Sequence, residues 1–160
     1  MKLEIFLAGS KKLDKQRDII RNQVMQWNAN RSVNSHDDDT CVVYTFENFC
    51  DSITGDGLTS QERYNKFIRE RADIAFFVLY DEINEKTKEE FDTAYESCMN
   101  SKRRAPDLIV FSHKSSSNKE IEEIRKQLTE VEKYFKEYDS DENLKEQIGP
   151  VLDKYFSRIL

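Results

Sequence analysis

The 160-residue sequence has few of the residues that build metal centres, disulfide frameworks or glycine-rich loops. It contains 3 cysteines, 2 histidines, 4 glycines and 2 prolines. Cys41, Cys50 and Cys98 are odd in number, and their spacing pairs them with neither His36 nor His113. We therefore expect reduced thiols, typical of a cytoplasmic protein, and no zinc site. There is no phosphate loop and no G-x-G-x-x-G motif.

Long apolar runs and a basic surface are also missing. No stretch approaches the ~20 apolar residues of a membrane helix. Residues 1–12 lack the apolar region and cleavage site of a signal peptide. The net charge is -6, and the basic clusters at 11–12 and 102–104 are short. Proteins that follow a phosphate backbone usually carry a basic face, so we expect neither a membrane nor a nucleic-acid partner.

Apolar segments of strand length alternate with segments of helical periodicity along the chain. We expect strands at 3–9, 41–49, 73–80 and 106–114, and helices at 13–31, 61–72, 86–102, 117–135 and 141–160. The last helix should kink or break at Gly149–Pro150. The strand at 73–80 is apolar on both faces, which is typical of a central parallel strand. This alternation predicts an α/β fold with a parallel sheet and helices on both of its faces.

The chain has the length and apolar content of one domain, residues 1–160, with 38% hydrophobic residues. It could be a complete small protein or a module excised from a longer one. Asp73, at the start of the central strand, is expected to be structural, and Phe76–Phe77 to lie in the core. The span from Lys119 to Tyr138 should present a solvated charged face, although Tyr134, Phe135 and Tyr138 could instead form a docking stripe for another domain.

Candidate chemistry lies where the parallel strands end, because ligands bind outside the carboxyl ends of such a sheet. The segments at this edge are Gly9–Ser10, 51–60, 80–90 and 112–117. The amides of Gly9–Ser10 could face a phosphate or a ribose. The same two residues would also suit an ordinary strand-to-helix turn.

Glu89 and Glu90 fall in the first turn of the helix expected at 86–102. Thr87 and Glu90 match a capping box, with Thr87 as the N-cap, and the helix dipole favours acidic residues there. Alternatively, Glu90 points across the sheet edge, where it could hydrogen-bond a ribose or stabilise an oxocarbenium-like transition state. The residues alone leave both interpretations open.

Several segments together resemble a known group of proteins. A first strand ending "IFLAGS", a helix starting "LDKQRD" and the strand "ADIAFFVLYDEI" leading into "TKEEFDTAYE" are similar to bacterial TIR-like domains and to nucleoside deoxyribosyltransferase-like proteins. The resemblance covers roughly residues 3–115. The closing "KEYDSDENLKEQIGPVLDKYF" is similar to the final helix of TIR-like modules fused to larger bacterial proteins. The resemblance implies a three-layer, flavodoxin-like parallel sheet of four to five strands.

The resemblance to TIR-like domains also implies an activity. Enzymatic members cleave the nicotinamide–ribose bond of NAD as effectors in bacterial defence or signalling, so NAD would be a substrate and no cofactor is expected. Their key glutamate begins the helix after the central strand, which matches Glu90. The loop from Phe49 to Ser60 would mediate activating self-association, and a fused or separate sensor domain could accompany the chain.

The same resemblance suggests how the substrate is held. The Gly9–Ser10 turn corresponds to the loop that lines the nucleotide pocket. Phe6, Phe46 or Tyr80 could stack on a base or on nicotinamide. Nicotinamide departs as a neutral molecule, so one carboxylate near the ribose can suffice, which explains the lack of a catalytic histidine, cysteine or metal cluster.

Two departures from the TIR pattern leave alternatives open. "AGSKK" lacks the usual Ser-His pair, and no serine or cysteine precedes the glutamate in "DEINE". Glu82 or Glu85 could therefore be the working carboxylate. The chain could also be a nucleoside 2-deoxyribosyltransferase-like N-glycosidase, or a non-catalytic nucleotide-sensing or interaction module in which Glu90 is only a cap.

Overall fold

Five parallel strands form a single sheet in the computed structural model, which describes residues 2–34, 40–45 and 57–159. The strands are β1 (Lys2–Ala8), β2 (Thr40–Tyr44), β3 (Ile74–Leu79), β4 (Asp107–His113) and β5 (Tyr134–Tyr138). Their order is β2-β1-β3-β4-β5, and every neighbouring pair is parallel. This is the flavodoxin-like order of doubly wound α/β proteins, so the expected fold class is confirmed.

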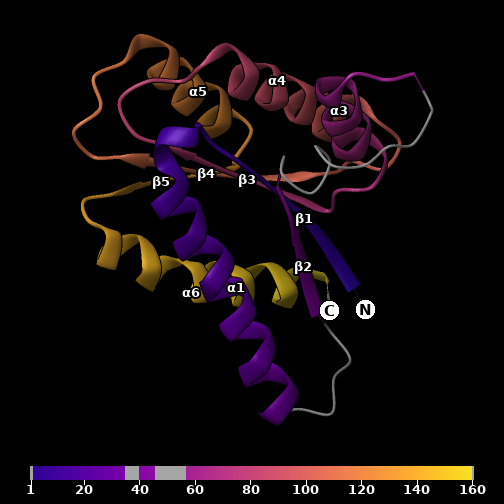
Figure 1. Ribbon diagram of the computed structural model, residues 1–160, viewed down its shortest axis with the longest axis vertical. Coiled ribbons are helices and arrows are strands. Elements are labelled where there is room, and N and C mark those ends of the chain that lie inside the picture. Colours follow the sequence, from indigo (N-terminus) through magenta and orange to yellow (C-terminus); the bar gives the residue numbers. More distant parts are fainter. Residues whose placement is uncertain (1, 35–39, 46–56, 160) are drawn as a thin grey trace.

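Helices cover both faces of the sheet and complete the three layers (Figure 1). The 3₁₀ turn η1 (Lys11–Leu13), α1 (Asp14–Asn34) and α6 (Asp141–Ile159) lie on one side, and α3 (Ser60–Glu70), α4 (Glu85–Asn100) and α5 (Lys119–Glu130) on the other. Parallel crossovers are right-handed. From β1 to β2 the chain moves towards one edge of the sheet, and from β2 through β3 to β5 it moves towards the other edge. The connecting helix α1 therefore lies on one face, and α3, α4 and α5 lie on the opposite face.

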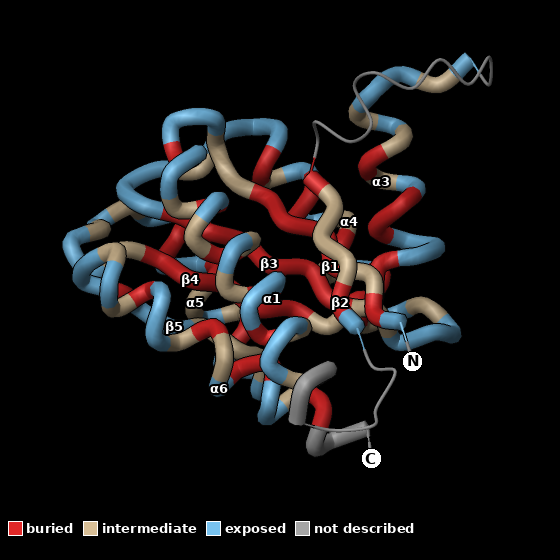
Figure 2. Tube along the Cα trace, turned by 60° about the horizontal axis from the view of Figure 1, so that its bottom comes forward, coloured by how far each residue is buried: buried red, intermediate tan, exposed pale blue. Residues whose placement is uncertain are grey.

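The central strand β3 explains why both faces need cover. All six of its residues are buried, and Figure 2 shows burial along β3 and along most of β1 and β4. Phe76 belongs to the core under α1 and α6, and Phe77 to the core under α4. At the start of the strand, the Asp73 carboxylate accepts the Glu4 N–H at 2.8 Å, in keeping with its expected structural role.

The helix expected at 117–135 is wrong in its second half. α5 ends at Glu130, Glu132 takes a positive φ of 57°, and the chain then enters β5. β5 is short, and its aromatic residues at 134, 135 and 138 have the spacing of a helical stripe as well as of a strand. The fifth strand was therefore hidden by a pattern that fits both structures.

The first turn of α4 also differs from expectation. Asn84, not Thr87, is the N-cap, and its side chain accepts the Thr87 N–H at 2.8 Å. The helix therefore starts at Glu85, and Thr87 is buried inside it. Glu90 lies in the second turn, so the capping-box interpretation of Glu90 is wrong.

Two other boundaries differ from the sequence-based expectation. The last helix is not broken at Gly149–Pro150: α6 runs through Pro150, because buried residues on both sides of it, including Ile148 and Val151, pack against the core. β2 ends at Tyr44. The rest of the strand expected at 41–49, including Phe46, lies outside the described residues, because the structure does not describe residues 46–56.

Replacing the N-cap of α4 should destabilise the protein. We expect Asn84→Ala to lower the free energy of unfolding by about 1 kcal/mol, because the Thr87 N–H loses its acceptor. Chemical denaturation followed by circular dichroism measures the change. Asn84→Ser, which keeps an accepting oxygen, should retain most of the stability. Equal midpoints for wild type and Asn84→Ala would mean that another residue caps the helix.

Candidate functional site

The strand order reverses between β1 and β3, and their carboxyl ends lie side by side. Ala8 pairs with Phe77, so Gly9 and Ser10 follow beside Val78 and Leu79. In doubly wound sheets, ligands bind in the crevice at such a reversal. The predicted Gly9–Ser10 turn therefore lies at the position where proteins of this fold class bind ligands.

Gly9 is required by the close packing at this edge. A Cβ on Gly9 would lie 2.9 Å from Val78 Cγ1, 3.1 Å from the Val78 carbonyl oxygen and 3.3 Å from Arg17 Cδ. Any side chain here would have to displace β3 or Arg17. Ser10 has a local role, because its Oγ accepts the Lys12 N–H at 3.1 Å and caps η1.

Arg17 is a buried cation that the sequence analysis missed. It is 2% exposed, and its guanidinium forms an ion pair with Asp14. A signal was present in the sequence, since Arg17 stands four residues after Leu13 and three before Ile20, on the apolar stripe of α1. A charge on such a stripe is rarely buried without a specific reason.

Glu90 is a buried acid on α4. It is 7% exposed, and burial is the main cause that raises its pKa from 4.5 to about 7. A hydrogen bond from Gln61 of α3 opposes this shift, the charge of Glu89 adds to it, and the positive charges of Arg17 and Lys86 lower the pKa. The carboxyl group therefore changes charge near neutral pH.

Four elements thus contribute to one group of residues, which we name the switch-point cluster: Gly9, Arg17, Gln61 and Glu90. Gly9 follows β1, Arg17 comes from α1, Gln61 from α3 and Glu90 from α4. A carboxylate in such surroundings can stabilise a developing positive charge, because its field is not screened by water. Acids with strongly raised pKa values are frequent at functional sites.

The two alternative carboxylates have ordinary surroundings. The side chain of Glu82 is 56% exposed and pairs with Lys12 at 3.1 Å. Glu85 is exposed at the first position of α4. Among these three glutamates, Glu90 is the one whose environment changes its chemistry.

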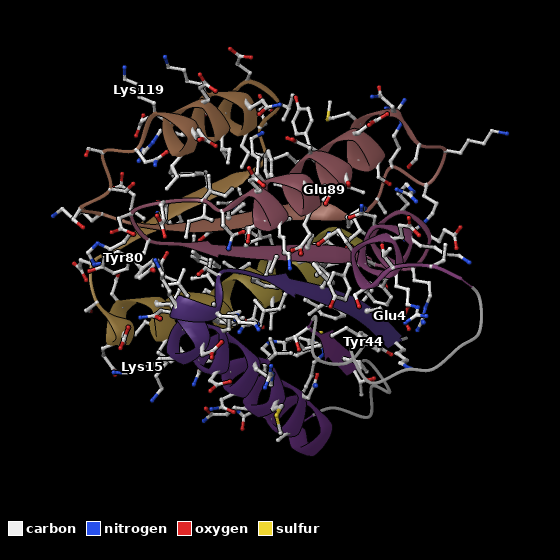
Figure 3. The ribbon with its side chains drawn as sticks, turned by 45° about the horizontal axis from the view of Figure 1, so that its top comes forward. Glu4, Lys15, Tyr44, Tyr80, Glu89 and Lys119 are labelled. Carbon is white, nitrogen blue, oxygen red and sulfur yellow. The ribbon has the colours of Figure 1, made fainter. Side chains whose placement is uncertain are left out.

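The three predicted stacking residues have different positions. Phe6 has no exposed surface, and its ring packs against Tyr64 and Phe67 at centroid distances of 6.4 and 6.1 Å. It is a core residue that offers no face to a ligand, as its place in the continuous apolar run 5–8 could have indicated. Phe46 lies outside the described residues. Tyr80 is 36% exposed and lies at the end of the sheet opposite Glu4 (Figure 3).

The described residues also bear on the cysteines, on a metal site and on membrane-spanning helices. Cys41 and Cys98 are buried cysteines that form no disulfide, and Cys50 is not described. Within residues 2–34, 40–45 and 57–159, no three histidine, cysteine, aspartate or glutamate side chains come together as a metal site would require. No helix in these ranges has the length and apolarity to cross a membrane.

The strand order β2-β1-β3-β4-β5, with helices on both faces of the sheet, defines a flavodoxin-like α/β fold. No protein-family profile and no curated protein matches the sequence. Among solved structures, oxidised Flavodoxin 1 from Bacillus cereus is similar, with 15% identity over 96% of this chain and 97% of that chain, at a TM-score of 0.44. A flavodoxin from Streptococcus pneumonia TIGR4 is 12% identical over 96% and 98%, at 0.45. Likeness at this level carries no argument about function.

Glu90→Gln should stabilise the protein at alkaline pH. The folded pKa of about 7 exceeds the ordinary value of 4.5, so the folded chain binds more protons than the unfolded chain between these values. Wild-type stability should therefore fall as the pH rises through this window. The full shift corresponds to about 3 kcal/mol of unfolding free energy. Glu90→Gln should therefore be more stable than wild type by up to this amount at pH 8, and should show no such gain at pH 4.

Denaturation curves at pH 4, 6 and 8 measure this difference. Glu89→Gln, at the exposed neighbouring position, is the matched control and should keep most of the wild-type pH dependence. If Glu90→Gln and wild type lost stability in parallel as the pH rises, Glu90 would not be the buried acid described here.

Proposed function

We propose that this protein cleaves the nicotinamide–ribose bond of NAD, with Glu90 as the catalytic carboxylate. The observation that carries the proposal is the buried Glu90 carboxyl group, with a pKa near neutrality, at the carboxyl edge of β1 and β3. The resemblance to TIR-like domains supplies the substrate. NAD acts as a substrate in this reaction, and no cofactor or metal is proposed.

The chemistry needs one anionic group close to the ribose. When the N-glycosidic bond breaks, its electron pair leaves with nicotinamide, which becomes neutral, and positive charge develops on the ribose ring. The ionised Glu90 stabilises this charge. Water then adds to the sugar carbon and its proton passes to Glu90, giving ADP-ribose; attack by a group of the same molecule would give a cyclic product.

Arg17 has two effects on this reaction. Its positive charge favours the ionised form of Glu90, which is the form that stabilises the ribosyl cation. Its aliphatic stem also packs close to Gly9, since a Cβ there would lie 3.3 Å from Arg17 Cδ, so the two residues fit together at the end of β1. Both effects are electrostatic or steric, and neither requires Arg17 to touch the substrate.

We further propose that the protein acts as an effector in bacterial defence or signalling and becomes active by self-association through the loop from Phe49 to Ser60. The support for this role is the resemblance to TIR-like domains. Residues 49–56 of the loop lie outside the described part of the chain. A fused or separate sensor domain would supply the activating signal.

A second candidate is a nucleoside 2-deoxyribosyltransferase-like N-glycosidase. The same carboxylate would then attack the sugar as a nucleophile, and the "AGSKK" segment after β1 is closer to that branch of the resemblance. The non-catalytic alternative has lost one of its supports, because Asn84 and not Glu90 takes part in capping α4.

Release of nicotinamide by the purified chain tests the proposal directly. The chain is incubated at high concentration with NAD and a crowding agent, and products are separated by chromatography. We expect nicotinamide and ADP-ribose from the wild type, and a rate at least ~100-fold lower from Glu90→Gln, because the stabilising charge is removed. Glu82→Gln and Glu85→Gln are matched controls that should remain active.

Loss of activity in Glu82→Gln or Glu85→Gln, with Glu90→Gln unimpaired, would move the catalytic role to that residue. If the clustered wild-type chain released no nicotinamide but cleaved deoxynucleosides, the second candidate would replace the first. Binding of nucleotide without any turnover would favour the sensing module.

The pH dependence of NAD cleavage should follow Glu90. The ionised form is active, so kcat/KM should rise with pH and level off above the pKa of about 7. Glu89→Gln should move this rise to lower pH, because the charge of Glu89 raises the pKa of Glu90. Initial rates between about pH 5.5 and 8.5 measure both effects; a rate that fell over this range would contradict the role of an ionised carboxylate.

A further inference from the structure

Three aromatic rings from the ends of adjacent strands stack at the carboxyl edge of the sheet. Tyr80, directly after β3, lies face to face with His113 at the end of β4, with ring centroids 4.0 Å apart and an interplanar angle of 22°. His113 meets Tyr138 of β5 edge-on, at 5.3 Å and 88°. The register explains the contact, because Leu79 pairs with Ser112 and the next residues on both strands are therefore neighbours.

The two inner rings are fixed in place. Tyr138 is buried, and its hydroxyl donates to the Leu79 carbonyl oxygen at 2.9 Å. The Ser115 N–H donates to His113 Nδ1 at 3.1 Å, and Ser115 Oγ lies 2.7 Å from the same nitrogen. Tyr80 therefore rests on a rigid support, which limits the entropy that its ring would lose on binding a ligand.

Tyr80 also keeps part of its ring surface in solvent. Among the described residues, Met25 and Tyr80 are the large hydrophobic side chains that are exposed, at 61% and 36%. Met25 lies on α1, away from the strand ends. Tyr80 lies at the edge of the sheet where ligands bind in this class of fold. A flat aromatic surface there suits a planar heteroaromatic ring, which stacks with little regard to its hydrogen-bonding groups.

The rings lie at a useful distance from the switch-point cluster. Gly9 is beside Val78, and Tyr80 follows Val78 by two residues, or about 7 Å along the strand. His113 is on the next strand, about 5 Å further across the sheet. A dinucleotide with one end at the switch-point cluster could reach these rings, because two sugars and a pyrophosphate separate its bases.

A cation that could hold a phosphate lies three residues after Gly9 and pairs with a residue that follows Tyr80 by two. Lys12 of η1 pairs with Glu82, which follows β3, and both side chains are well exposed. An exposed ion pair of this kind contributes little stability, so a phosphate group can replace the Glu82 carboxylate on Lys12. This exchange would join the β1–η1 turn to the ligand between Glu90 and Tyr80.

We infer that the Tyr80–His113 pair is the binding platform for the second base, a purine, of a dinucleotide whose scissile bond lies at Glu90. This inference rests on the proposed function for the identity of the dinucleotide. Tyr80 stacks on the purine, and His113 is a positioning residue that holds the Tyr80 ring. The platform would distinguish dinucleotides from mononucleotides that carry only nicotinamide.

Calorimetric titration of the Glu90→Gln variant tests the platform without turnover. The probes are NAD, AMP and nicotinamide mononucleotide. Adding Tyr80→Ala should weaken the binding of NAD and AMP about tenfold or more, by loss of stacking on one base. It should leave the Kd of nicotinamide mononucleotide unchanged. Tyr80→Phe should retain binding of all three, His113→Ala should weaken AMP and NAD selectively, and Met25→Ala is the control for loss of an exposed apolar side chain.

Each contrary outcome has a defined meaning. Equal weakening of NAD and nicotinamide mononucleotide in Tyr80→Ala would overturn the inference, as would unchanged binding of all probes or no binding of AMP to the parent variant. If wild type releases no nicotinamide but AMP binding depends on Tyr80, the proposed cleavage fails and the platform stands. If NAD is cleaved and its Kd is the same with and without Tyr80, the platform fails and the cleavage stands.

Discussion

The complete burial of β3 is the constraint on which the other features depend. A strand with no solvent-facing side must be covered by helices above and below, and parallel pairing on both edges must supply its hydrogen-bond partners. Right-handed crossovers meet both demands only if the chain changes direction once within the sheet. That change of direction places the carboxyl ends of β1 and β3 side by side at the reversal, where this class of fold binds its ligands. The candidate site is thus a consequence of how the central strand is covered.

The switch-point cluster places ionisable groups where the fold would be more stable with apolar ones. Burial drives the Glu90 carboxyl group towards its neutral form, and the neighbouring Arg17 is buried as well. Burying two ionisable groups is unfavourable for stability alone. The helices α1, α3 and α4 hold these groups together because their apolar faces pack independently of the site. Stability elsewhere in the molecule offsets the local cost, which is a common relation between function and fold.

The sequence predicted the parts of the structure that repeat a simple period. Four of the five strands and the division of helices between two faces follow from apolar runs that alternate with helical patterns. β5 did not follow, because five residues with aromatic side chains at positions 134, 135 and 138 fit either structure. Asn84 and Thr87 are both good capping residues, and only the packing of Thr87 against the core decides between them.

The candidate site was predictable in part. The position of Glu90 after the central strand was visible, and so was the Gly9–Ser10 turn. Arg17 could have been recognised from its place on an apolar stripe, whereas Gln61 had no signal, because its approach to Glu90 depends on how α3 packs beside α4. Phe6 was selected for its chemistry although it lies in the apolar run 5–8 of β1, which is buried on both faces. Local periodicity does not describe such contacts between distant elements.

Gln61, which lowers the pKa of Glu90 as a hydrogen-bonding neighbour, links the position of a helix to the binding of a proton. Gln61 is the second residue of α3, so the first turn of that helix helps to set the proton affinity of the acid on α4. Displacing that turn would leave Glu90 with a higher proton affinity. By reciprocity, protonating Glu90 weakens the attachment of the turn by the same free energy. Moving the start of α3 away from Glu90 would therefore favour proton uptake by this acid near pH 7.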